Sequence, residues 1–115
     1  MDNMLKKLND YGADVEGAMG RFLDDVDLYK TCFKTLVEDE AFVKLGEELK
    51  AENYEQAFEY AHTLKGVIGN MGITPLYRVI CSIVETLRKN ELDGLQGYYA
   101  DAVEQLNQLK AMQEQ

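Results

Sequence analysis

The 115-residue sequence contains no tryptophan, a single proline and two cysteines, and it has no long run of apolar residues. A helix that crosses a membrane needs about 20 consecutive apolar residues, and no stretch of this sequence approaches that length. The single proline and the lack of runs in which β-branched and polar residues alternate argue against a sheet. We therefore expect an all-α protein.

The two cysteines, Cys32 and Cys81, and the only histidine, His62, do not form a motif with each other. Because no Cys/His cluster with metal-ligand spacing exists, a structural zinc site is excluded, and we predict no bound metal. The N-terminal sequence has no apolar signal region, which leads us to expect a cytoplasmic protein with free, reduced thiols.

The charge is strongly one-sided, at −9 with an isoelectric point near 4.5. An acidic surface repels nucleic acid phosphates and anionic lipids, so neither is expected as a partner. Hydrophobic residues make up 46% of the chain, and the length is sufficient for one core. We predict a single domain over residues 1–115, and we expect it to act as a monomer.

Apolar residues that recur at three- and four-residue intervals predict helices along the whole chain. We expect an antiparallel four-helix bundle within residues 25–112, preceded by short N-terminal helices within residues 1–23. The expected bundle members are residues 25–37, residues 54–71 and two helices that begin near Thr74 and Asp93. Expected helix boundaries include caps at Asp14, at Asp24 or Asp25, and at Thr74, capping boxes at Asn53/Gln56 and Asp93/Gln96, and terminating residues at Gly12 and Gly72.

The helix expected over residues 54–71 carries the only histidine. Its predicted buried stripe consists of Ala57, Tyr60, Ala61, Leu64, Val67, Ile68 and Met71. At about 100° per residue, His62 lies nearly opposite the centre of this stripe and should point to solvent. Phe58, Glu59, Lys65, Gly66 and Gly69 share the histidine face.

Two glycines on that face, Gly66 and Gly69, call for an explanation. Each costs about 1 kcal/mol relative to alanine inside a helix, and on a solvent-facing surface we expect no core packing that explains the loss. The functional interpretation is that the missing side chains let another molecule approach His62, while Lys65 attracts an anion to it. The alternative is a surface histidine on a loosely built helix.

His62-Thr-Leu-Lys65-Gly66, followed by Gly69-Asn70-Met71-Gly72, resembles the motif of histidine-containing phosphotransfer (HPt) domains. These domains relay phosphate between receiver domains in multistep two-component signalling. The resemblance covers roughly residues 12–112. It departs from the family where the two positions after Gly66, often small, are Val67 and Ile68, which we place on the core side.

The resemblance implies that His62 is the phosphoacceptor and that Lys65 offsets the charge of the phosphoryl oxygens. Gly66 and Gly69 would clear space for the partner, and Phe58 and Glu59 would flank the binding surface. Phe58 is either an apolar docking contact or a residue packed beneath a neighbouring helix. The implied protein is a carrier rather than an enzyme. It holds no cofactor, and its receiver partner supplies an aspartate and Mg²⁺.

Two other classes remain as alternatives. The first is an interaction module that binds a signalling partner without transferring phosphate. The second is a carboxylate metal bundle, which needs Glu and Glu-x-x-His pairs that project into the core. Glu59 and His62 have that spacing, but they are the only such pair and face away from the apolar stripe.

Overall fold

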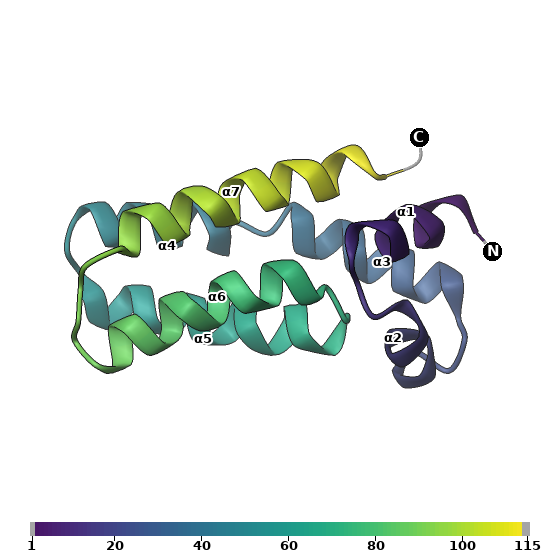
Figure 1. Cartoon of the computed structure of the whole chain (residues 1–115), viewed down its shortest axis with the longest axis horizontal. Coiled ribbons are helices and arrows are strands. Elements are labelled where there is room, and N and C mark those ends of the chain that lie inside the picture. The colour runs from purple at the N-terminus through teal and green to yellow at the C-terminus, as the bar shows by residue number, and fades with distance from the viewer. Residues whose placement is uncertain (1, 114–115) are drawn as a thin grey trace.

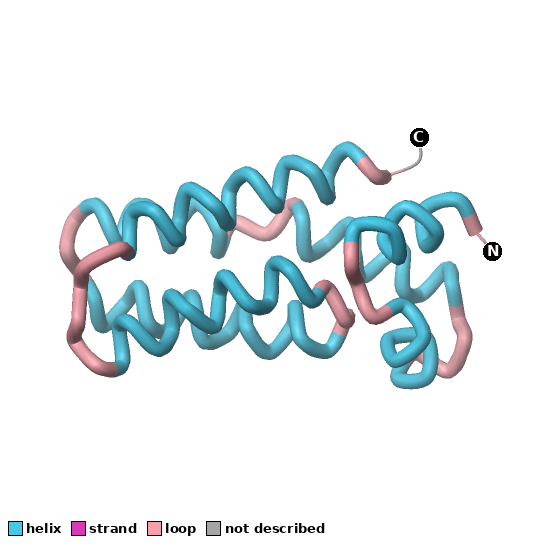
Figure 2. Tube along the Cα trace, viewed as in Figure 1, coloured by secondary structure: helices cyan, strands magenta, loops and turns pink. Residues whose placement is uncertain are grey.

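The computed structural model describes residues 2–113, and these residues form seven helices and no strand. In chain order the helices are α1 (Asn3–Tyr11), α2 (Val15–Arg21), α3 (Val26–Val37), α4 (Ala41–Lys50), α5 (Tyr54–Asn70), α6 (Thr74–Arg88) and α7 (Leu95–Ala111). The prediction of an all-α bundle with short N-terminal helices is confirmed (Figure 2).

The bundle has four arms, which are α5, α6, α7 and the consecutive pair α3 and α4. Helix α4 packs along α5, α5 packs on α6, and α6 packs on α7, which contacts both α3 and α4. Figure 1 shows α3 and α4 following one another along the long axis, so that together they make one arm. Our assignment of this arm to residues 25–37 alone was wrong. The helix is interrupted after Glu38, and the Asp39 carboxylate accepts a hydrogen bond at 2.8 Å from the Ala41 N–H to start α4.

All seven helices contribute apolar side chains to one buried core. The close approach of α7 to α4 depends on Gly46, because a Cβ there would lie 2.3 Å from the Tyr99 hydroxyl oxygen. The Tyr99 hydroxyl donates a hydrogen bond at 2.9 Å to the carbonyl of Phe42. A glycine in α4 thus lets an aromatic ring of α7 cross over the helix backbone.

The N-terminal helices close one end of the bundle, where α5 ends and the chain turns into α6 (Figure 1). Arg21 of α2 donates from Nε to the carbonyl of Asn70 at 2.8 Å, and the Asp14 N–H donates to the carbonyl of Gly72 at 2.7 Å. The buried Tyr29 hydroxyl donates to the carbonyl of Met71 at 2.8 Å. The last carbonyls of a helix lack partners within it, and a cation is favourable there, so these contacts stabilise the end of α5.

Burial raises the pKa of Tyr29 well above its usual range. The hydroxyl therefore keeps its proton at neutral pH and remains a donor to Met71. This bond ties α3 to the same turn that α2 contacts.

Several predicted helix boundaries are confirmed, and three are wrong. The Asp14 and Asp25 carboxylates cap α2 and α3, and Gly12 and Gly72 adopt positive φ after α1 and α5. Neither expected capping box forms, because the Asn53 side chain makes no cap bond and the N-cap of α7 is Gly94, at φ 88°. The N-cap of α6 is Ile73 rather than Thr74, whose hydroxyl instead donates back to the carbonyl of Gly72.

One residue of the predicted stripe on α5 lies outside the core. Val67 is 43% exposed, whereas Ala57, Ala61, Leu64 and Ile68 are buried. Our placement of Val67 on the core side was therefore wrong. Its side chain is open to solvent, although its neighbour Ile68 is fully buried.

Gly72 is required by the turn between α5 and α6. Its φ is +71°, and a Cβ there would lie 2.6 Å from the Asp14 carbonyl oxygen. We predict that Gly72→Ala lowers the free energy of unfolding by about 1–3 kcal/mol, measured by urea denaturation. Gly97→Ala is the control, because a Cβ there meets nothing within 4 Å. Equal stability of the two variants would contradict this role of Gly72.

Candidate functional site

His62 lies on the exposed face of α5, as predicted. Within residues 2–113 its side chain makes no hydrogen bond and no salt bridge, so its ring nitrogens are open to solvent or to a partner. It lines an open surface hollow of about 400 Å³. The other lining residues are Lys65, Gly66, Gly69, Asn70 and Tyr77.

Lys65 lies one helical turn after His62 and is half-buried. It forms no salt bridge with any described residue, so no carboxylate within residues 2–113 is paired with its charge. The hollow therefore combines an uncommitted imidazole with an uncommitted ammonium group. Although the chain has a net charge of −9, no carboxylate is among the residues that line this hollow.

The two glycines of the motif have different surroundings. A Cβ on Gly66 would meet nothing within 4 Å, so no contact inside the described chain explains this glycine. A Cβ on Gly69 would lie 2.9 Å from the ring of Tyr77. The expectation that no packing accounts for the glycines was therefore wrong for Gly69, which makes room for an aromatic ring of α6.

Tyr77 is a site residue that the sequence reasoning missed. The signal was available, because Gly69 and Tyr77 lie four residues before and four residues after Ile73. In two antiparallel helices joined by a short turn, positions equidistant from the turn lie side by side. Interaction with the Cys81 side chain, one turn further along α6, raises the pKa of Tyr77.

Phe58 lies one turn before His62 and is half-buried against the core. Its ring stacks on the imidazole, with centroids 5.6 Å apart and an angle of 16° between the ring planes. The Arg88 guanidinium carbon of α6 lies 5.7 Å from the centroid of the Phe58 ring. Arg88 in turn pairs with Glu85, at 2.6 Å between Nη1 and Oε1.

Glu59 is exposed, and it lines a second hollow of about 320 Å³ beside the histidine. The hollow is also lined by Tyr54, Glu55, Phe58, Leu87 and Arg88. Glu59 and His62 are both exposed and so do not project into the core as a metal bundle requires. Among the described residues, no group of three or more His, Cys, Asp or Glu side chains is placed to hold a metal ion.

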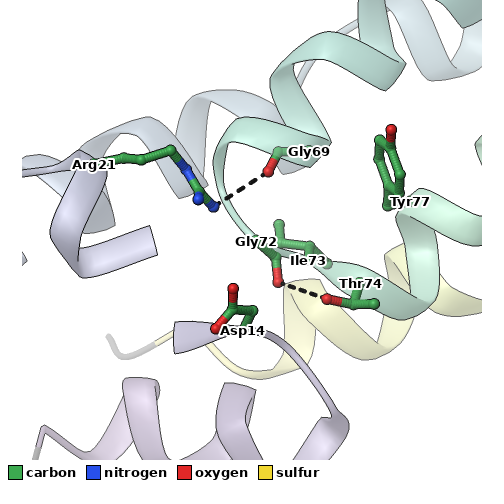
Figure 3. Close-up of a pocket in the computed structure, with 7 residues that line it drawn as sticks. All are labelled: Asp14, Arg21, Gly69, Gly72, Ile73, Thr74 and Tyr77. Carbon is green, nitrogen blue, oxygen red and sulfur yellow. Dashed lines mark hydrogen bonds between the residues drawn. The ribbon is translucent and has the colours of Figure 1, made fainter. Parts of the chain in front are cut away.

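A third hollow, of about 300 Å³, lies between α2 and the turn from α5 to α6 (Figure 3). Figure 3 shows Arg21 reaching from α2 to the carbonyl of Gly69, with Tyr77 standing on the other side of that glycine. Gly69 and Tyr77 line both this hollow and the one that contains His62. The N-terminal helices therefore border the site and do not cover the histidine.

The chain matches a known protein family. The family model described as the Hpt domain matches residues 27–115, and the chain therefore belongs to the HPt family. The family match begins at residue 27, whereas we expected the resemblance to begin near residue 12. Helices α1 and α2 therefore lie outside the family match. A search of curated proteins and a search of solved structures each found no match.

Membership of the family means that the chain is a histidine phosphotransfer carrier of phosphorelays, of a kind that interacts with receiver domains. None of its described helices is both long enough and apolar enough to cross a membrane.

The different surroundings of the two glycines predict different effects of alanine on stability. We expect Gly66→Ala to raise the free energy of unfolding by up to about 1 kcal/mol, because the helix propensity improves and nothing is displaced. Gly69→Ala should gain less or lose stability, since the Tyr77 ring must move. Urea denaturation of both variants measures the difference, and an equal gain in both would contradict the packing role of Gly69.

Proposed function

We propose that the protein is a phosphorelay intermediate that accepts a phosphoryl group on His62 from a receiver-domain aspartate and passes it to another receiver. The observation that carries this proposal is the structural environment of the His62 side chain. The only histidine of an HPt family member is exposed and lies beside a lysine in an open hollow, and neither side chain bonds to another side chain of residues 2–113.

The proposed step is a reversible transfer. The lone pair of a neutral imidazole nitrogen attacks phosphorus, a P–N bond forms, and the P–O bond to the receiver aspartate breaks. The aspartate leaves as a carboxylate, while the imidazole ring initially carries one positive charge. Because both the acyl phosphate and the phosphoramidate are energy-rich, the transfer can run in either direction.

In this proposal each neighbour of His62 has a limited task. Lys65 offsets negative charge on the phosphoryl oxygens, since such transfers depend mainly on positioning and charge neutralisation. Gly66 leaves open space for the backbone and side chains of the receiver. The receiver supplies the aspartate and Mg²⁺, and the chain acts as a cytoplasmic monomer without a cofactor of its own.

His62→Gln tests the acceptor directly. The side chain is exposed, so we expect the variant to keep its fold and to lose phosphate acceptance completely. The measurement is transfer of radioactive phosphate from phosphorylated receivers to the purified chain, with circular dichroism as the control for folding. The label should be acid-labile and alkali-stable. Continued labelling of the variant would exclude His62, and binding of a receiver without labelling of the native chain would favour an interaction module.

Lys65 tests the electrostatic part of the proposal. We expect Lys65→Ala to change the free energy of unfolding by less than about 0.5 kcal/mol, as surface substitutions usually do. It should nevertheless slow transfer, because one compensating charge is lost. Lys65→Arg should keep much of the rate, since it keeps the charge. The measurement is the rate of phosphoryl transfer to each of the three forms from one phosphorylated receiver. An alanine variant as fast as the native chain would show that Lys65 has no part in the mechanism.

A further inference from the structure

We propose that Phe58 is a positioning residue that holds the imidazole of His62 in the orientation from which it receives the phosphoryl group. This inference rests on the proposed function and adds to it a residue that acts through His62. It is carried by the stack of the two rings, at 5.6 Å between centroids and 16° between planes.

The geometry of the stack suits orientation without obstruction. The lone pair of a neutral imidazole nitrogen lies in the plane of the ring, and the Phe58 ring is stacked nearly parallel to that plane, with the two centroids 5.6 Å apart. An exposed histidine with no hydrogen bond to the described chain would otherwise exchange among staggered rotamers. Stacking on Phe58 favours one of them and leaves the ring nitrogens open.

Phe58 is itself held from two sides. It packs against the core as a half-buried residue, and the Arg88 guanidinium lies 5.7 Å from its ring centroid. Arg88 is paired with Glu85 on the same helix, which restricts where the guanidinium can go. Phe58 and Arg88 lie fifteen residues before and fifteen after Ile73, so the α5–α6 hairpin itself brings them together.

Orientation matters here because the phosphoryl donor belongs to a second folded protein. Once a receiver has docked, its aspartate occupies a fixed place, and transfer needs the attacking nitrogen in line with the breaking bond. An imidazole that is stacked on Phe58 already has the orientation needed for attack when the complex forms. Loss of the stack should therefore slow transfer within the complex and leave the formation of the complex unchanged.

The test compares Phe58→Leu with the native chain in single-turnover transfer from a phosphorylated receiver at increasing concentrations. We expect the maximal rate to fall about 2- to 10-fold, the fold-change that corresponds to a typical aromatic pair. The receiver concentration that gives half the maximal rate should not change. Phe58→Tyr, which keeps the ring, should restore the rate.

A second readout reports the stack without any receiver. The ring current of Phe58 shifts the carbon-bound ring protons of His62 in NMR spectra, and we expect these resonances to move in the leucine variant and to stay in the tyrosine variant. Tyr54→Leu is the matched control, because Tyr54 lines the same hollow without a stack on the imidazole. It should leave both the resonances and the maximal rate unchanged.

The outcomes separate this inference from the proposed function. An increase in the half-saturating concentration with an unchanged maximal rate would make Phe58 a docking contact and overturn the inference. Unchanged kinetics or unmoved His62 resonances in Phe58→Leu would overturn it as well. If the native chain takes no phosphate from any receiver, the proposed function fails first, whereas failure of this inference alone leaves native transfer intact.

Discussion

The turn that ends α5 is the constraint on which the rest of the site depends. The carbonyls of residues 69–72 receive donors from Arg21, Tyr29 and the Asp14 backbone, so three separate segments converge on four residues. The left-handed backbone of Gly72 then reverses the chain within a few residues. Because this turn is fixed, the register between α5 and α6 is fixed, and each residue of α6 beside the histidine face has its place.

The two sides of helix α5 have opposite effects on its stability. The buried side carries small and branched apolar residues, and burying one Leu or Ile side chain contributes about 1.5–3 kcal/mol. The exposed side gives up about 1 kcal/mol at each helix-interior glycine. The packed side therefore offsets the cost of the open side, and a helix that would be marginal alone can present His62 on a surface with few side chains.

Much of this arrangement follows from the sequence, since residue periodicity decides which face of α5 is buried and hence that His62 is exposed. The spacing of residues cannot show contacts made between helices, and this is where the prediction fell short. The ring of Tyr77 over Gly69 and the stack of Phe58 on His62 depend on side-chain rotamers that a helical wheel does not contain. One of the two capping boxes that were wrongly predicted has a similar cause. The N-cap of α7 is Gly94, at φ 88°, one residue after Asp93, and the spacing of polar residues gives no sign of this.

The site is chemically incomplete on its own, and this incompleteness is consistent with a carrier. Within residues 2–113 no group hydrogen-bonds to His62 and no carboxylate pairs with Lys65, and a Cβ on Gly66 would meet nothing within 4 Å. A complete active site would bind phosphate tightly or hydrolyse the phosphorylated residue. A carrier must instead release the phosphoryl group to the next protein. In the proposed function the chain would contribute His62 as an exposed nucleophile, and the rest of the chemistry would come from the receiver that docks. On this view, orientation of the imidazole is one of the few parts of the reaction that the carrier itself can control.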